Sequence, residues 1–510
     1  MKEKSIIKNF IVSSFILLIF IACTSKKEKR AVALYKSYCA SCHLLPEIND
    51  LPKHIWQDGV LPDMAARMGI IDSTNDPLRR ISRKEQVAIM ESGIYPRTPM
   101  LPQEDWSLLS EYIISMAPDS LDTENNKHKT EELVQFTPEA IQLDSTKGSL
   151  ISFLTFDQKE KTIISADLNG NLIKYDAKKA IIASSEKTVD ALTTYIQKDG
   201  ITYITSIGYL NPSERQRGSL DVYRDSIKLN KKSIILHRPV HTLVEDLNND
   251  GRNEIVVSEF GNLTGSLSLF QESDAHTFEK KILLNLPGTI RTIAKDLNGD
   301  GKTDLMALTS QGQESIVAFY QQQDLKFQKE TLLRFSPVSG SSWFELIDFD
   351  GDGDDDIITV HGDNADKSYV HKPYHGLRIH INNGKNEFNE AYFYSLNGAT
   401  RVNCEDYDHD GDIDFAIVAT FPDYEKNPNG SFVYLENNNP DNFDFKPYSF
   451  DTSTLGRWFL LDSGDVDSDG DIDIVLSSFT YTFTPVPDNL YDTWNNSDID
   501  IIILKNNLVP

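Results

Sequence analysis

Three residues near the N-terminus have the types and the spacing that covalent attachment of a cofactor requires. Cys39 and Cys42 are separated by two residues, and His43 follows directly. Two thiols one helical turn apart can add to the two vinyl groups of a haem, and the adjacent imidazole can then bind the iron from the proximal side. A zinc knuckle would need further nearby thiols or imidazoles, which are scarce, and a redox dithiol would leave His43 without a role. The spacing therefore predicts c-type haem attachment.

A distal iron ligand must come from the segment that follows this motif. Met100 lies in the proline-bounded segment YPRTPMLP, directly before a predicted helix, and is the favoured candidate. Met64 and Met68, in LPDMAARMG, are the alternatives, and His54 is a weaker one. Ligation by histidine and methionine raises the reduction potential relative to ligation by two histidines, which suits acceptance of electrons in an oxidising compartment.

Helices are predicted on both sides of these residues. One precedes the motif at 30–38 and another covers 103–116. The apolar residues of the second helix recur at helical spacing: Trp106, Leu109, Ile113 and Met116. The order of helix, Cys-x-x-Cys-His, proline–methionine loop and closing helix resembles the small class I cytochrome c domain, over residues 31–118. That resemblance implies a monohaem electron-transfer domain.

Five nine-residue segments farther along the chain share an acidic frame. They begin at 246, 296, 348, 406 and 465 and read DLNNDGRNE, DLNGDGKTD, DFDGDGDDD, DYDHDGDID and DVDSDGDID. Each has Asp or Asn at positions 1, 3 and 5, Gly at position 6 and Asp or Glu at position 9. Together they carry −20 of the formal net charge of −27, so the acidity of the chain is local.

Such a frame suits a hard cation bound by oxygen atoms. Side-chain oxygens at positions 1, 3 and 5 and a backbone carbonyl at position 7 can surround Ca²⁺, and Gly at position 6 permits the sharp turn. An EF-hand would place Glu at position 12, but here position 12 falls in an apolar run, so each loop leads into a strand. The chain is therefore expected to bind up to five Ca²⁺ ions. The candidate ligands are Asp246, Asn248, Asp250, Glu254, Asp296, Asn298, Asp300, Asp304, Asp348, Asp350, Asp352, Asp356, Asp406, Asp408, Asp410, Asp414, Asp465, Asp467, Asp469 and Asp473.

The spacing of the frames indicates a repeated fold. Their starts are 50, 52, 58 and 59 residues apart, the period of a propeller blade. Two degenerate units precede them, which makes seven blades, and 133–143 is predicted to supply the strand that the last blade lacks. The pattern resembles the FG-GAP/VCBS family of calcium-binding propellers. The expected fold class is therefore mainly β, a seven-bladed β-propeller closed as a ring and preceded by a small all-α cytochrome c domain.

Polar and aromatic residues are expected at one mouth of the propeller channel. The first strand of each blade lines the channel, so residues about five positions before the frames lie near the mouth opposite the calcium loops. Long loops between the second and third strands of blades 5 to 7 emerge at the same mouth. The residues of this possible ligand face are His241, Arg291, Trp343, Arg401 and Arg457. An anionic or polyhydroxylated ligand would suit the arginines, unless neighbouring carboxylates balance them.

The N-terminus has the features of a processed export signal. Lys2 and Lys4 precede an apolar run, and FIAC at 20–23 resembles a bacterial lipobox. The resemblance implies cleavage before Cys23 and lipidation of its thiol, and an ordinary signal peptide or a membrane helix is the alternative. No later segment is long and apolar enough to cross a membrane, so the chain is expected outside the cytoplasm, attached to a bacterial membrane by lipid alone. Cys404 is predicted to be a buried thiol in a strand.

These features define the expected domains and function. The domains are a signal peptide (1–22), a lipid-anchored linker (23–30), the cytochrome c domain (31–118), a linker (119–133) and the propeller (134–510). The negative net charge argues against nucleic acid as a partner. We expect electron transfer with a redox partner, beside a calcium-stabilised propeller that recognises an unknown ligand or partner. The alternative is an oxidoreductase whose propeller oxidises a small substrate and passes electrons to the haem, although the five tryptophans show no blade periodicity.

Overall fold

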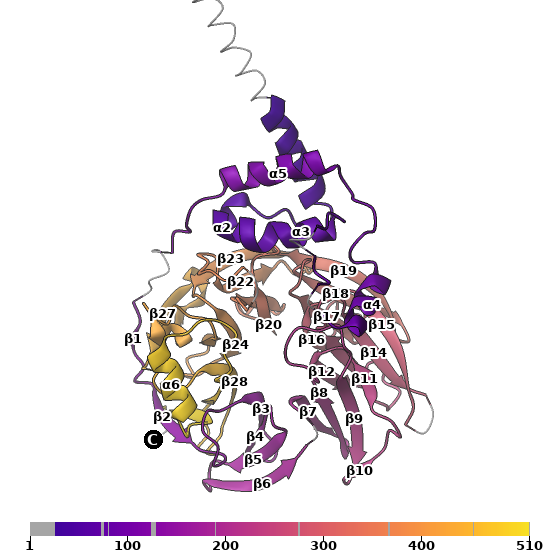
Figure 1. Cartoon of the computed structure of the whole chain (residues 1–510). Helices are drawn as coiled ribbons and strands as arrows, with labels where there is room; N and C mark the ends of the chain where they lie inside the picture. The colour runs from indigo at the N-terminus through magenta and orange to yellow at the C-terminus, as the bar shows by residue number, and fades with distance from the viewer. Residues whose placement is uncertain are drawn as a thin grey trace, which may run out of the picture. The chain divides into compact units, whose positions relative to one another are not determined.

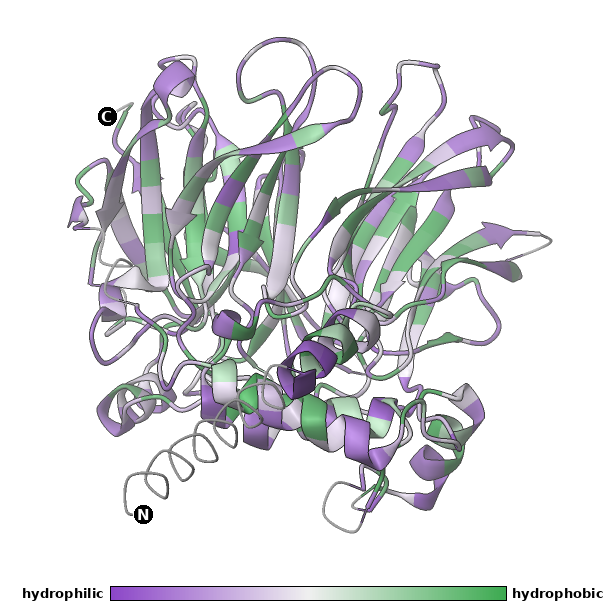
Figure 2. Cartoon of the chain, turned by 90° about the horizontal axis from the view of Figure 1, so that it is seen from above, coloured by the Kyte–Doolittle hydropathy of each residue, from purple (hydrophilic) through white to green (hydrophobic). Residues whose placement is uncertain are grey.

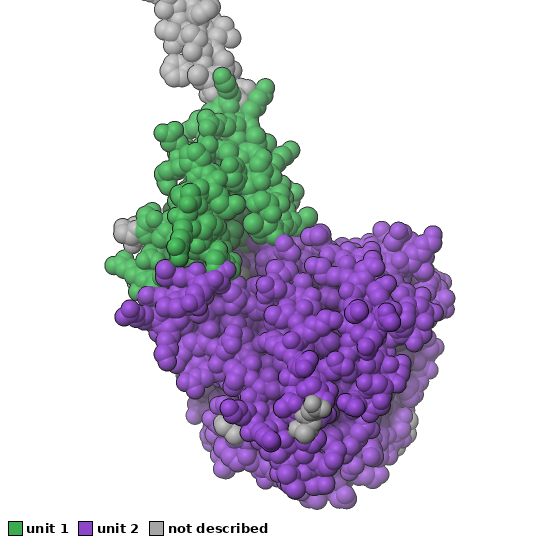
Figure 3. Space-filling view, turned by 90° about the vertical axis from the view of Figure 1, so that its right-hand side faces the viewer, with its two compact units in different colours: residues 1–81, 93–121 green, residues 82–92, 122–510 purple. Residues whose placement is uncertain are grey.

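The computed structural model describes residues 26–72, 76–79, 81–123, 129–188, 190–273, 276–365, 368–451 and 453–508. The chain divides into two compact units (Figure 3). Unit 1 comprises residues 1–81 and 93–121, and unit 2 comprises residues 82–92 and 122–510. No helix within the described ranges has both the length and the apolar character needed to cross a bilayer. The predicted export signal and the predicted lipidation site, Cys23, lie outside the described residues.

Unit 1 is helical. Its elements are a helical stretch over 26–34, a π-helical turn (Tyr35–Cys39), a 3₁₀ turn (Ile48–Asp50), α2 (Lys53–Ile55), a π-helical turn (Trp56–Val60), α3 (Leu61–Arg67) and α5 (Gln103–Met116). The bounds of α5 confirm the helix predicted at 103–116. Of the four apolar residues that recur at helical spacing, Trp106, Leu109 and Ile113 are buried, whereas Met116 at the last position of the helix is 53% exposed.

The described residues of unit 2 form seven sheets arranged in a ring, in which neighbouring strands pair antiparallel except at one short outer strand (Figure 1). The inner strand of each sheet contacts the inner strand of the next, and the seventh contacts the first, so the ring is closed. These inner strands are β3 (Ile151–Asp157), β7 (Leu192–Lys198), β12 (Pro239–Glu245), β16 (Thr289–Lys295), β20 (Ser341–Ile347), β24 (Ala399–Glu405) and β28 (Trp458–Gly464). The predicted seven-bladed propeller is confirmed.

The remaining strands of the first four blades follow in chain order. Blade 1 adds β4 (Thr162–Asp167), β5 (Asn171–Asp176) and β6 (Ile181–Lys187), and blade 2 adds β8 (Ile201–Ser206), β9 (Gly218–Arg224), β10 (Ile227–Lys228) and β11 (Ile234–Leu236). Blade 3 adds β13 (Glu254–Glu259), β14 (Ser266–Glu272) and β15 (Phe278–Leu284), and blade 4 adds β17 (Asp304–Thr309), β18 (Ser315–Gln323) and β19 (Lys326–Arg334). The outer edge of blade 2 is divided, since β10 and β11 both pair with β9.

The last three blades contain the longest connections. Blade 5 adds β21 (Asp356–His361), β22 (Gly376–Asn382) and β23 (Phe388–Ser395), blade 6 adds β25 (Asp414–Ala419), β26 (Phe432–Asn439) and β27 (Asp444–Ser449), and blade 7 adds β29 (Asp473–Ser478) and β30 (Ile501–Asn506). The connection between β29 and β30 forms a helix, α6 (Asp488–Asn496). Its buried residues Leu490 and Trp494 are four positions apart, a helical spacing.

The second strand of blades 3 to 7 is buried along its whole length. Every residue of β13, β17, β21, β25 and β29 is buried. Such a strand has neighbours on both sides in its own sheet and packs against adjacent blades on both faces. This explains the continuous apolar runs that follow each acidic frame, which appear as green bands on the strands in Figure 2.

An N-terminal strand closes the ring. β2 (Phe136–Ile141) pairs antiparallel with β30, with Phe136 opposite Asn506 and Ile141 opposite Ile501. This confirms the prediction that 133–143 completes the last blade. A shorter strand, β1 (Glu131–Glu132), pairs in parallel with β27 of blade 6.

Closure depends on the aromatic ring of Phe136. Its side chain is 3% exposed and packs edge-on against Tyr407 and Tyr434, with ring centroids 5.9 and 5.3 Å away. We expect Phe136→Ala to lower the free energy of unfolding by about 3–5 kcal/mol, because the truncation leaves a cavity at the blade 6–7 junction. Urea denaturation of the two proteins measures the difference. Val134→Ala, at a residue 68% exposed, is the control and should change it by less than about 0.5 kcal/mol. Equal effects would contradict a closing role for Phe136.

Candidate functional site

The Cys-x-x-Cys-His motif lies at the end of a helical stretch in unit 1. Cys39 is the last residue of the π-helical turn, and Cys42 and His43 follow in a turn. Neither cysteine forms a disulfide; Cys39 is partly buried and Cys42 is exposed. Burial raises the pKa of the Cys39 thiol to about 11.

The imidazole of His43 is oriented by a neighbouring carbonyl. Its Nδ1 lies 2.8 Å from the backbone oxygen of Leu44. Because a carbonyl oxygen only accepts hydrogen bonds, Nδ1 carries a proton and donates it, and in the neutral imidazole the lone pair is then on Nε2. A histidine that binds a metal commonly has this arrangement.

The candidate distal ligands differ in exposure. Met100 is 47% exposed, and its backbone N–H donates to the carbonyl oxygen of Met68 at 2.9 Å. Met68 is buried, Met64 is partly buried, and His54 is exposed on α2. The Met100 loop thus lies beside Met68, and the Met68 side chain is packed among buried residues of unit 1.

The five acidic frames occupy equivalent places in the propeller. Each connects the first strand of blades 3 to 7 to the second, and position 9 is the first residue of the second strand. All five loops therefore lie at the same end of the channel, as the sequence predicted. In three of them, carboxylate oxygens from different residues lie within 4.8 Å of one another, close enough to hold one cation. The three groups are Asp348, Asp350 and Asp356; Asp406, Asp408 and Asp410; and Asp465, Asp467 and Asp469.

The loop backbone has two left-handed positions. The glycine at position 6 has φ between 81° and 106° in all five loops, and its N–H donates to the carboxylate at position 1. Position 4 is left-handed as well, and the residues there are Asn249, Gly299, Gly351, His409 and Ser468. Only the position 6 requirement was evident in the sequence. These two turns direct the side chains at positions 1, 3 and 5 toward one point.

Position 9 has a structural role that the sequence did not reveal. In blade 6 one oxygen of Asp414 accepts the N–H of Tyr407 at 3.2 Å, and the other accepts the N–H of Asn437 on the third strand at 2.8 Å. Asp304, Asp356 and Asp473 repeat this pattern. Burial raises the pKa of the Asp414 carboxyl to about 8. These carboxylates fasten each loop to its sheet, and their assignment as calcium ligands stays a prediction.

Every inner strand carries a β-bulge at the same place. The bulge falls two residues into the strand and redirects the side chain that follows it. The residues that follow it are Phe153, Thr194, His241, Arg291, Trp343, Arg401 and Leu460. Four of the five predicted ligand-face residues belong to this set, and the sequence missed Phe153 and Thr194 because their blades lack the acidic frame.

Trp343 is the centre of a cluster in the channel. The guanidinium carbons of Arg291 and Arg401 lie 4.2 and 4.3 Å from its ring centroid. The His241 ring contacts it edge-on at 6.3 Å, although blade 4 lies between their two blades. Glu345, two residues beyond Trp343, binds both terminal nitrogens of Arg291 and accepts the indole N–H at 2.8 Å. We call these five residues the channel cluster.

Glu345 balances part of the positive charge of the channel cluster. It neutralises Arg291, so one of the two stacked arginines needs no external anion. Arg401 donates to the carbonyl oxygens of Thr400 at 2.8 Å and Ser342 at 3.4 Å, and burial with the nearby Arg291 lowers its pKa to about 10. Burial and the two arginines lower the pKa of His241 to about 3, so its imidazole is neutral. An external ligand would therefore bind the channel cluster at Arg401 and His241.

Arg457 lies apart from the channel cluster. It is fully buried directly before β28, and one of its nitrogens donates to the carbonyl oxygen of Tyr481. Cys404 lies on a strand, β24, as predicted, but it is partly rather than fully buried. Burial of its thiol raises its pKa well above the ordinary value.

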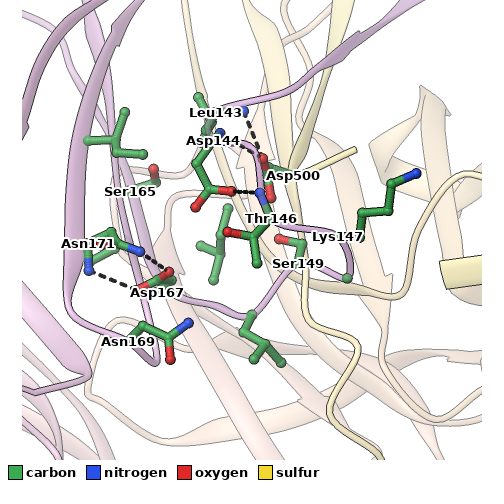
Figure 4. Close-up of a pocket in the computed structure, with 15 residues that line it drawn as sticks. Leu143, Asp144, Thr146, Lys147, Ser149, Ser165, Asp167, Asn169, Asn171 and Asp500 are labelled. Carbon is green, nitrogen blue, oxygen red and sulfur yellow. Dashed lines mark hydrogen bonds between the residues drawn. The ribbon is translucent and has the colours of Figure 1, made fainter. Parts of the chain in front are cut away.

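A pocket lies between blades 7 and 1 (Figure 4). Asp500 accepts the N–H of Leu143 at 2.7 Å, and Asp167 accepts the N–H and the side-chain amide of Asn171 at 2.8 and 2.6 Å. These carboxylates hold the connection from β2 to β3 and the β4–β5 turn in place. No site residue predicted from the sequence lines this pocket.

Comparison with known proteins identifies the repeat. Residues 296–359 match the FG-GAP-like repeat family, a segment that contains the acidic frames of blades 4 and 5. No curated protein matches the sequence. Similar solved structures include the N-terminal domain of Nup159 (10% identity, TM-score 0.42, 74% of this chain and 97% of that chain) and the β-propeller domain of Myceliophteria thermophila Cps50 (Swd1) (9% identity, TM-score 0.43, 72% and 99%). By its own strand topology unit 2 is a seven-bladed propeller, and the family match shows that it contains an FG-GAP-like repeat.

Proposed function

We propose that this protein is a lipid-anchored monohaem c-type cytochrome of an extracytoplasmic compartment, which transfers electrons and carries a calcium-stabilised propeller for ligand or partner recognition. The single observation that carries the proposal is the His43 imidazole. It follows the two cysteines of the motif and donates through Nδ1 to the Leu44 oxygen, which leaves Nε2 available to a metal.

The surroundings of the motif fit a haem. Cys39 and Cys42 would be joined to its vinyl groups through their Sγ atoms, and His43 would bind its iron. Leu44, Ile71 and Met100 of the same unit are 45%, 41% and 47% exposed, and a bound porphyrin would supply an apolar surface for such side chains. When bound, haem supplies a one-electron carrier.

Substitution of Met100 tests which of three methionines is the sixth ligand of the iron. Met100→Ala should lower the reduction potential and remove the weak sulfur-to-iron absorption band, because a thioether ligand raises the potential of the iron. Potentiometric titration and visible spectroscopy measure both effects. Met116→Ala, at another exposed methionine of the same unit, is the control and should change neither. A retained band in Met100→Ala would assign the ligand to Met64 or Met68.

The loops of blades 3 to 7 support the calcium part of the proposal. Three of them gather carboxylate oxygens within 4.8 Å, where the charges repel and a bound cation would relieve the repulsion. In the first two loops Asn248 and Asn298 stand at position 3 and offer an amide oxygen instead. We expect these two loops to bind more weakly.

Mixing the oxidised protein with a panel of redox proteins, sugars and alcohols tests the function. Reduction of the haem by a redox protein supports electron transfer. Reduction by a small molecule alone would favour the oxidoreductase alternative, in which the propeller holds the substrate. The lipid anchor at Cys23 is tested separately, by detergent partitioning of the wild type and Cys23→Ala.

A further inference from the structure

Arg457 is a buried cation with an incomplete set of hydrogen bonds. Its side chain is 0% exposed. Nη1 donates to the carbonyl oxygen of Tyr481, but Nε and Nη2 have no hydrogen-bond partner among the residues that the structure describes. A buried N–H without a partner costs free energy, and the cost is larger when the group is charged.

Two other arginines of unit 2 show how the fold ordinarily satisfies this side chain. Arg238 is 9% exposed, and its three nitrogens donate to three carbonyl oxygens, those of Tyr209, Gly261 and Leu210. Arg291 donates two N–H groups to the carboxylate of Glu345, which balances its charge, although its Nε also has no hydrogen-bond partner within the described residues. Arg457 is more deeply buried than either, and it has one carbonyl where Arg238 has three.

The groups near Arg457 include two phenols, and the Asp423 and Glu425 carboxylates lie near one of them. Burial raises the pKa values of the Tyr424 and Tyr369 phenols, and the positive charge of Arg457 opposes both rises. A side-chain hydrogen bond with Arg457 also lowers the pKa of Tyr424, so both rings lie near the guanidinium, although Nε and Nη2 remain without a partner within the described residues. The Tyr424 hydroxyl already donates to the carbonyl oxygen of Thr420 at 3.2 Å. Asp423 faces His371 at 3.8 Å and Lys426 at 3.9 Å. Within the described residues, no carboxylate forms an ion pair with Arg457.

We infer that Arg457 forms a binding site for a small monovalent anion, either chloride or a carboxylate, held by Nε–H and Nη2–H. These two N–H groups form the edge of the guanidinium fork that accepts a halide or both oxygens of a carboxylate. Full burial limits the ligand to an anion small enough to be enclosed. The inference deepens the ligand-recognition part of the proposed function at one residue of the expected ligand face, and it depends on neither the haem nor the calcium loops, so its failure is distinguishable from failure of the electron-transfer proposal.

Thermal unfolding of the full chain in different sodium salts tests the inference, at constant ionic strength and constant calcium. Chloride and formate are the probes, and isethionate is the bulky reference anion. Chloride or formate should raise the wild-type melting temperature by on the order of 5 °C at about 100 times its dissociation constant, and Arg457→Met should remove this dependence. Arg238→Met is the matched control and should lose stability but keep the dependence. The same melting temperature in all three salts would overturn the inference, as would a dependence that persists in Arg457→Met.

A measurement on the wild type keeps the test decisive if Arg457→Met does not fold. Crystals grown with bromide as the small anion should show an anomalous peak beside Nε and Nη2 of Arg457, and crystals grown with formate should show planar density there. Each result identifies one of the two candidate anions. Water alone at this position under both conditions would contradict an anion site.

Discussion

Removing calcium should lower the melting temperature of the propeller by on the order of 10 °C. Each ion that binds only the folded ring contributes about 2.7 kcal/mol when its concentration is 100 times its dissociation constant, and three of the loops gather full carboxylate groups. Without the ions, the carboxylates of Asp406, Asp408 and Asp410 lie within 4.8 Å of one another and repel. Differential scanning calorimetry with calcium and with excess chelator measures the shift.

A single loop can be tested with a matched pair of variants. Asp408→Asn removes one ligand charge from the blade 6 loop, and it should lower the melting temperature in calcium but change it little in chelator. Asp441→Asn makes the same charge change at an exposed residue of the same blade and should have no effect in either condition. A melting temperature that does not respond to chelator in the wild type would refute a structural role for calcium.

Replacing His43 should have the largest effect on the spectrum of unit 1. His43→Ala removes the proximal nitrogen but leaves both cysteines, so covalent haem should be retained while the Soret and α bands change to those of a protein without its proximal ligand. The physical reason is that the Nε2 lone pair, held in position by the Leu44 carbonyl, sets the ligand field of the iron. Visible spectra of the reduced and oxidised proteins show the difference.

The exposed histidine His54 provides the control for that experiment. It lies in the same unit, on α2, and His54→Ala should leave the bands and the potential unchanged. A wild-type spectrum in His43→Ala would exclude His43 as the proximal ligand. A change in both variants would indicate a general effect on folding of unit 1.

The sequence predicted the propeller because its repeat leaves local signals. Acidic frames with Gly at position 6 mark five first-to-second-strand loops, and their spacing counts the blades. The closing strand was predictable as well, because a ring without it would leave an open sheet edge. The helix α6 was not expected, since a single pair of apolar residues, Leu490 and Trp494, is too weak a periodic signal in a long loop.

The sequence did not predict which residues the site residues contact. Glu345 lies two residues from Trp343 on the same strand, so their side chains share a face, but its pairing with Arg291 of the previous blade depends on how two blades pack. The bulges likewise appear only in strand register. They explain why residues of four blades, from His241 to Arg401, converge in one cluster. The role of position 9 could not be predicted either. An acidic residue after a calcium-type loop is expected to be a ligand from the sequence, whether or not its oxygens accept backbone N–H groups.

The most direct test of the account is the intact mass of the wild-type chain after expression with the haem-attachment machinery of an oxidising compartment. The mass measured under denaturing conditions should exceed that of the polypeptide by one haem, and the purified protein should show a reduced α band that disappears on oxidation. The variant with both Cys39→Ala and Cys42→Ala should have the mass of the polypeptide alone. A colourless wild-type protein without added mass would contradict the assignment of this chain as a c-type cytochrome.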